Sequence, residues 1–237
     1  MLAFCDIPLG GGEEAACVRC AGSRPQSAEE TIGPEARIDS ALDAAPGAGV
    51  FFSDVGSLDH PDLPRFAAHA ARAGASRIAV RTSGRSLADP GAAASLLESG
   101  VRIVEVVFLG SSEQTHDALT GVRGAFEAAA SAVGNLRSAA DALNVKVAVR
   151  GRVSVCRHNV QDLPATVMYL AESGVSSIVL ACDPALEARR SIDWIAAACD
   201  TGTVNRVWVA VSGMDEGVLG EKALHAVDAI TFTRMSA

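Results

Sequence analysis

The chain has 237 residues, of which 49% are hydrophobic, and it carries a formal charge of -8 at pH 7. This length and composition predict one globular domain, spanning residues 1–237, with a single large core. The acidic balance argues against a nucleic-acid groove or an anionic membrane surface, because both require a clustered basic face.

The start of the sequence predicts a cytoplasmic protein. Residues 1–6 lack the basic start and long apolar run of a signal peptide, and no segment reaches the roughly 18 apolar residues of a membrane span. Six cysteines in such a compartment are expected to be reduced thiols or metal ligands rather than disulfides. We expect the partners to be small molecules or proteins.

The first part of the chain predicts two strands separated by a loop and a helix. Residues 2–9 form an apolar run that ends in three glycines, which predicts a strand and then a flexible loop containing Cys17 and Cys20. A helix is predicted at 34–45, because proline suits its first turn. The apolar run at 50–53 predicts the second strand.

From there a unit repeats, consisting of an amphipathic helix, a glycine near its end and an apolar strand. Clear strands are predicted at residues 77–82, 101–109, 145–149 and 177–181, and weaker patterns predict two more at 206–211 and 229–233. Strict alternation of helices and apolar strands means parallel pairing with the helices outside. The pattern predicts an α/β fold, a partial or complete (β/α) TIM-like barrel with six clear parallel strands and as many as eight. An open doubly wound sheet is less favoured, because no Gly-x-Gly-x-x-Gly turn follows the first strand.

Five segments follow the predicted strands in a fixed order. They are the cysteine loop, Asp54-Val55-Gly56-Ser57 with the Leu-Asp-His-Pro-Asp-Leu run at 58–63, Thr82-Ser83-Gly84, the His-Asp-Ala-Leu-Thr-Gly run at 116–121, and the Asn-Val-Gln-Asp-Leu run at 159–163. In this order they resemble the radical S-adenosylmethionine superfamily in its core-barrel form. The resemblance covers roughly the first four fifths of the chain.

The resemblance implies an iron-sulfur site in the loop after the first strand. In the superfamily three thiolates, usually spaced Cys-x3-Cys-x2-Cys, hold three irons of a [4Fe-4S] cluster. Cys17 and Cys20 match the last two ligands, whereas Glu13 stands at the first position, and a carboxylate is a poor ligand for this soft cluster. Cys5 is the remaining candidate for a third thiolate, through a longer loop.

The resemblance also implies a cofactor pocket lined by the turns after the strands. Its candidate residues are Asp54, Gly56, Ser57, Thr82, Ser83 and Asn159. The superfamily has a Gly-Gly-Glu turn after the second strand, which gives room for the methionine group and helps to hold its ammonium. Here Asp54 and Val55 add side chains at the glycine positions, and Gly56 removes the glutamate carboxylate.

These departures favour a degenerate radical-SAM-like barrel that binds no cofactor. It would act as a non-catalytic accessory or substrate-presenting subunit, whose partner is an active radical SAM enzyme or a peptide or small-molecule substrate. The alternative is an active radical SAM enzyme, in which Cys5, Cys17 and Cys20 hold a [4Fe-4S] cluster that cleaves S-adenosylmethionine. No catalytic residue is assigned.

Two further groups of residues keep other readings open. An unrelated TIM-barrel enzyme would work through Lys146, predicted in the fifth strand, or through histidines that follow predicted strands. These histidines are His60, His116 and His158. Three arginines near strand ends can bind a carboxylate or phosphate, or can pair with Glu105 or Asp54. They are Arg81, Arg150 and Arg152.

Overall fold

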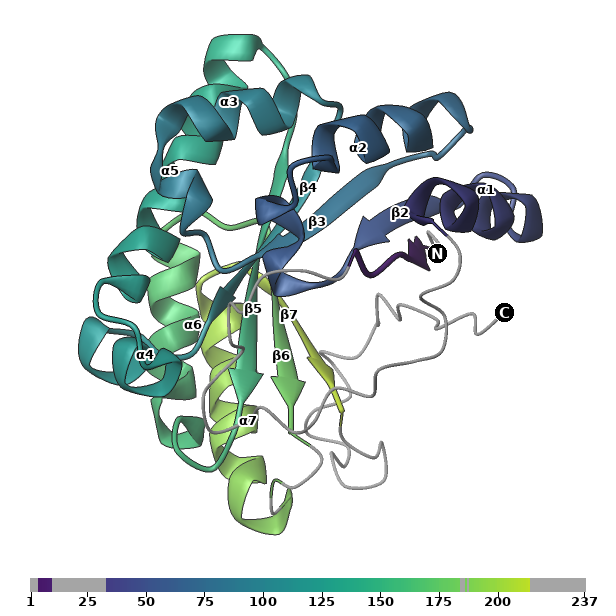
Figure 1. Ribbon diagram of the computed structural model, residues 1–237. Coiled ribbons are helices and arrows are strands. Elements are labelled where there is room, and N and C mark those ends of the chain that lie inside the picture. The colour runs from purple at the N-terminus through teal and green to yellow at the C-terminus, as the bar shows by residue number, and fades with distance from the viewer. Residues whose placement is uncertain (1–3, 10–32, 184–185, 187, 214–237) are drawn as a thin grey trace.

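The computed structural model describes residues 4–9, 33–183, 186 and 188–213. Seven parallel strands hydrogen-bond in chain order and form one curled sheet, a half-barrel (Figure 1). The strands are β1 (Phe4–Asp6), β2 (Gly49–Phe52), β3 (Ile78–Thr82), β4 (Ile103–Phe108), β5 (Ala148–Val155), β6 (Ser177–Cys182) and β7 (Trp208–Ser212).

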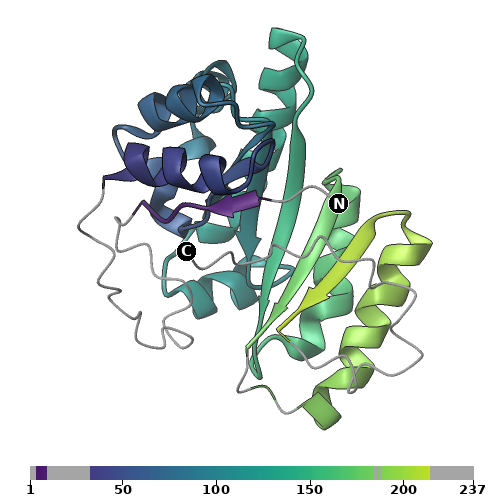
Figure 2. The same ribbon diagram turned by 90° about the vertical axis from the view of Figure 1, so that its right-hand side faces the viewer.

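The helices lie on the outer face of this sheet (Figures 1 and 2). They are α1 (Pro34–Ala44), α2 (Leu63–Arg72), α3 (Pro90–Glu98), α4 (Glu113–Thr120), α5 (Ala125–Leu143), α6 (Leu163–Glu172) and α7 (Ala188–Val204). Short 3₁₀ helices follow three strands: η2 (Val55–Asp59), η3 (Ser86–Ala88) and η4 (Val160–Asp162). Within the described ranges no helix combines the length and apolar character needed to cross a membrane.

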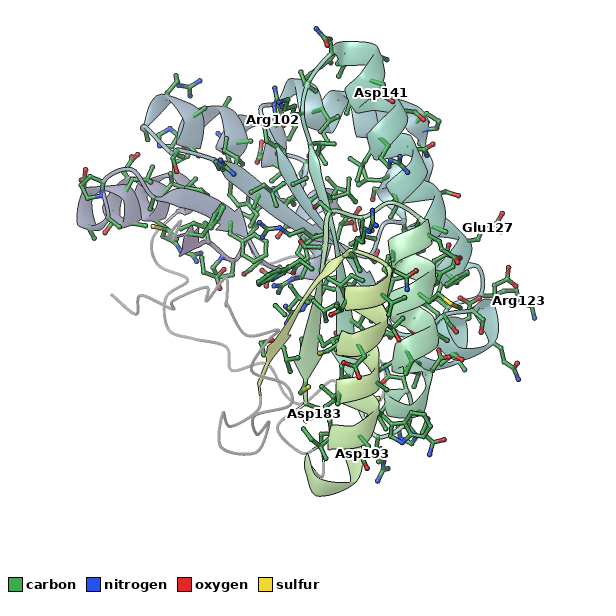
Figure 3. All side chains as sticks on the ribbon, turned by 180° about the vertical axis from the view of Figure 1, so that it is seen from behind. Arg102, Arg123, Glu127, Asp141, Asp183 and Asp193 are labelled. Atoms are coloured by element: carbon green, nitrogen blue, oxygen red, sulfur yellow. The ribbon has the colours of Figure 1, made fainter. Side chains whose placement is uncertain are left out.

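Local sequence explains where the helices begin and end. Prolines open α1, α2, α3 and α6, where the missing N–H costs no helical hydrogen bond. The Asp89 carboxylate caps α3 by accepting from the Gly91 N–H. α4 ends at Gly121, whose φ of 72° lies in the left-handed region that favours glycine. Arg102, just before β4, and Asp183, just after β6, lie at opposite ends of the molecule, as expected for the two ends of parallel strands (Figure 3).

Alternation along the strands gives the sheet two different faces. The outer face packs on the helices in one large apolar core that includes Phe52, Val80 and Phe108. The concave face is apolar at its beginning, where one cluster joins β1 to β4 through Phe4, Phe51, Ala79 and Ile103. At β5 and β6 its residues are half-buried and several are polar. The concave face is therefore the one that can meet a ligand.

The α/β fold, the partial barrel and its six clear strands are confirmed, and a seventh strand lies near the predicted 206–211. The strand predicted at 229–233 lies outside the described residues. The predicted bounds of the fifth strand are wrong, because β5 runs from Ala148 to Val155 and its charged positions belong to the strand. Lys146 therefore precedes β5 and is exposed, so its predicted position in a strand is also wrong.

Candidate functional site

A charged cluster lies on the concave face where β3, β4 and β5 run side by side. The register aligns Arg81 of β3 with Glu105 of β4 and Arg150 of β5. Arg81 Nε donates to Glu105 Oε1 at 2.6 Å and its NH1 group donates to the Ser53 carbonyl at 2.8 Å. The Arg81 guanidinium also lies over the Phe51 ring, 4.9 Å from its centre. The predicted pairing of an arginine with Glu105 is confirmed.

The two arginines of β5 are less fully paired. Arg152 NH1 lies 3.7 Å from Glu105 Oε1, too far for a good hydrogen bond. Burial, together with the charge of Arg81, lowers the pKa of Arg152 to about 10, while the charge of Glu105 acts in the opposite direction. Burial likewise lowers the pKa of Arg150. Both guanidinium groups remain protonated at neutral pH.

Glu105 is buried, with 1% of its side chain exposed. Its second oxygen, Oε2, accepts no hydrogen bond from any residue that the structure describes. A buried carboxylate costs several kcal/mol unless it is paired, so Arg81 and the nearby charge of Arg152 are what keep Glu105 in this position. The sequence predicts Glu105 only as a partner for arginine, and its central place in the cluster follows from the register.

The turn after β2, where the resemblance predicts the cofactor pocket, is the 3₁₀ helix η2. Asp54 precedes it, and Gly56 and Ser57 within it are buried. Ser57 Oγ has no hydrogen-bond partner within the described ranges. Val55 is the first residue of η2, at one of the positions where the superfamily has glycine. The turn is therefore compact, and Gly56 and Ser57 have little surface to offer to a ligand.

The turn after β3 contains the next two predicted residues. Thr82 is buried and its Oγ1 accepts from the Gly84 N–H at 3.0 Å. Ser83 Oγ accepts from the Arg85 N–H at 3.4 Å. Both hydroxyls thus take part in forming the turn itself.

Asn159 lies after β5 and joins two loops. Its Oδ1 accepts from the Cys156 N–H at 2.8 Å, and its Nδ2 donates to the carbonyls of Leu109 and Ser154 at 3.0 and 2.8 Å. The residue is 2% exposed. These bonds give the Asn159 amide a structural role in joining the two loops.

Neighbouring residues of the same loops are also held by hydrogen bonds. Both carboxylate oxygens of Asp162 accept from Ser111, one from its N–H and one from its hydroxyl, each at 2.7 Å. Asp117 accepts from the N–H groups of Gly124 and Phe126 at the start of α5. The segments after β4 and β5 that carry the resemblance therefore fix these two loops against each other.

The three histidines do not form one site. His116 follows β4, as predicted, but it lies on α4 and is buried against Phe108 and Phe126 of the outer core, so it does not face the concave side. The sequence pattern did not predict α4, although Ser112 is an N-cap whose hydroxyl accepts from the Thr115 N–H. His60 follows η2 and is half-buried, whereas His158 is exposed.

The described cysteines do not fit an iron-sulfur cluster. Cys5 is buried and its thiol donates to the Ala41 carbonyl of α1 at 3.5 Å, so it faces the helices rather than the concave face. Burial raises the pKa of Cys5, which disfavours the thiolate that a cluster requires. Glu13, Cys17 and Cys20 lie outside the described residues. Within the described part of the chain no group of three or more His, Cys, Asp or Glu side chains is arranged to hold a metal ion.

The chain matches no protein-family profile and no curated protein. Solved structures do resemble it. The structure of anSMEcpe with bound AdoMet has a TM-score of 0.61 and 15% identity, covering 89% of this chain and 64% of its own. Streptococcus suis SuiB bound to its precursor peptide SuiA has a TM-score of 0.65 and 12% identity, covering 90% and 49%. Methylornithine synthase (PylB) has a TM-score of 0.62 and 10% identity, covering 88% and 64%.

These three proteins are radical SAM enzymes. The chain has the fold of a radical-SAM-like barrel. It spans about half to two thirds of the length of these structures. At such low identity the likeness shows the fold alone, and a phosphonomutase-like barrel from Burkholderia cenocepacia also matches, with a TM-score of 0.55 and 16% identity.

Proposed function

We propose that this radical-SAM-like barrel is a non-catalytic subunit that presents a substrate to an active radical SAM enzyme, or assists it in another way. The observation that carries the proposal is the turn after β2. There Val55, Gly56 and Ser57 form a compact 3₁₀ helix where the superfamily has an open Gly-Gly-Glu turn. In the superfamily this place gives room for the methionine group and supplies a glutamate carboxylate, whereas here Val55 adds a side chain and Gly56 has no carboxylate.

Two further observations support the proposal. The Cys5 thiol is bonded to helix α1, which leaves the alternative [4Fe-4S] site short of its third thiolate unless β1 rearranges. Asn159 uses its amide group to join two loops. The residues of the scaffold are thus engaged in holding the fold.

A peptide is a substrate compatible with this role. Streptococcus suis SuiB, which has a similar fold, is bound to a precursor peptide. In this chain a ligand would meet the concave face, whose β5 and β6 positions are half-buried. A barrel without cluster chemistry can still hold a peptide there and deliver it to a partner enzyme.

The deciding experiment measures iron and acid-labile sulfide after anaerobic reconstitution, followed by an assay for S-adenosylmethionine cleavage. The wild-type chain is compared with Cys5→Ala and Cys17→Ala, and with Cys199→Ala as a control, since Cys199 is a buried thiol on α7. We expect no cleavage by the wild-type chain alone and no iron that depends on Cys5 or Cys17.

The alternative enzyme predicts the opposite result. A near-stoichiometric cluster that is lost in Cys5→Ala and Cys17→Ala but kept in Cys199→Ala, together with cleavage of S-adenosylmethionine, would refute the non-catalytic role. The same result would establish the active radical SAM enzyme with a cluster on Cys5, Cys17 and Cys20.

A further inference from the structure

Among the described residues, the charged cluster on the concave face has a charge opposite in sign to that of the whole chain. Three guanidinium groups and one carboxylate, from Arg81, Arg150, Arg152 and Glu105, sum to +2, whereas the chain has a net charge of -8. Asp6 is the other acid that the described strands direct to this face, and it lies on β1, four strands away from β5. A positive cluster inside an acidic protein attracts a small anion to that place.

Of the three arginines, Arg81 is the one whose donors are closely paired within the fold. Arg81 is bonded to Glu105 and to the Ser53 carbonyl. Arg152 contributes charge at 3.7 Å from Glu105 without a close hydrogen bond. Arg150 is aligned with Glu105 in the register and interacts with it through charge. Each guanidinium has five N–H donors, so the two arginines of β5 keep most of theirs for a ligand.

The placement of these two arginines suits one ligand group. They are two residues apart on β5, so they lie on the same face with their Cα atoms about 6.6 Å apart. Ser177 of β6 is aligned with Arg150 and can add a hydroxyl. The Arg152 side chain is 23% exposed, which leaves it accessible while partly removed from water. Charge-assisted hydrogen bonds are strong in such surroundings.

We propose that Arg150 and Arg152 form an oxyanion-binding site on the concave face, which takes a phosphate or carboxylate group of the ligand held in the half-barrel. The planar guanidinium groups match the geometry of either oxyanion. The Arg81–Glu105 pair lies beside the site and positions Arg152 through the charge of Glu105. An anion between the two arginines would also offset the desolvation that lowers their pKa values. This inference goes beyond the proposed function and holds whether or not the chain is an enzyme.

Isothermal titration of the full chain with inorganic phosphate, and separately with succinate, tests the site at low ionic strength and neutral pH. The variants are Arg150→Gln and Arg152→Gln, with Arg72→Gln as the control because Arg72 is an exposed arginine of α2. We expect each β5 substitution to weaken binding about tenfold or more, as the loss of a charged hydrogen-bond donor does. The Arg72→Gln chain should bind as the wild type does.

The outcomes separate the two ligand chemistries and test the site itself. Tighter binding of phosphate assigns the site to phosphoryl groups, and tighter binding of succinate assigns it to carboxylates. No binding of either ion by the wild-type chain at millimolar concentration, or equal weakening by Arg72→Gln, would overturn the proposal. Arg152→Lys keeps the charge but loses the planar guanidinium, and it is used if the glutamine variants fail to fold. Unchanged affinity in that variant would also contradict the assignment. None of these readouts depends on iron, so the result is independent of the test of the proposed function.

Discussion

Replacement of His116 should change how the stability of the fold depends on pH. His116 is 2% exposed, and its Nδ1 accepts a hydrogen bond from the Leu109 N–H at 3.1 Å. Burial lowers the pKa of His116 to about 4, and the charge of Asp117 opposes this shift only in part. The imidazole is therefore neutral in the folded protein at pH 7, with its proton on Nε2.

The size of the effect follows from linkage between protonation and folding. An unfolded histidine titrates near pH 6.5, so the unfolded chain takes up a proton before the folded chain does as the pH falls. The stabilisation is present in full above pH 6.5 and is lost progressively as the pH falls toward 4. The free energy of unfolding then decreases by about 1.4 kcal/mol per pH unit inside this window, or by about 2 kcal/mol between pH 7 and pH 5.

Urea unfolding at a series of pH values measures this loss in three proteins: the wild type, His116→Asn and His158→Asn. Asparagine can accept the Leu109 N–H through Oδ1 but does not titrate. We expect His116→Asn to be less stable at pH 7 and to lose about 2 kcal/mol less than the wild type between pH 7 and pH 5. His158 is exposed, so His158→Asn should follow the wild-type curve. Equal losses in the wild type and His116→Asn would refute the reasoning.

Three other predictions concern packing and charge. Arg81→Ala should lower the free energy of unfolding by about 3–5 kcal/mol in urea titrations, because it leaves Glu105 buried without its close partner; an unchanged midpoint would contradict this. Gly110→Ala should cost about 1–3 kcal/mol, since its Cβ would lie 2.5 Å from a threonine side chain, whereas Gly134→Ala has open space and should not destabilise the chain. Burial raises the pKa of Cys182 to about 12, so iodoacetamide at pH 8 should label it only after unfolding, as peptide mass spectrometry can check.

The alternation of helices and strands could be predicted because buried parallel strands and amphipathic helices leave different periodicities in the sequence. The predicted bounds of the fifth strand are wrong because they depend on the same apolar periodicity. Arg150 and Arg152 interrupt the apolar run and were placed at or near strand ends, although alternation puts them on the concave face while Val149 and Val153 pack outward. A charged residue within a strand is compatible with this half-barrel, because the concave positions of β5 are only half-buried among the described residues.

The charged cluster itself could be predicted only in part. The sequence offers two acids, Glu105 and Asp54, as partners for the arginines. The choice between them depends on the register of β3 and β4. Register is set by contacts between segments distant in the chain, which local patterns do not contain. The same limit applies to Asn159, whose partners Leu109 and Ser154 lie in the loop after β4 and in β5, respectively.

The segments that most resemble the superfamily after β4 and β5 are those that the fold itself requires. His116 bonds the end of β4, Asp117 holds the start of α5, and Asn159 and Asp162 join the two loops. A barrel of this shape needs these bonds whether or not it performs chemistry. Resemblance in these segments is therefore an argument about folding, and fold alone does not determine function. The argument about activity depends on the turn after β2 and on whether Cys17 and Cys20 bind iron, since those are the places where the chemistry would differ.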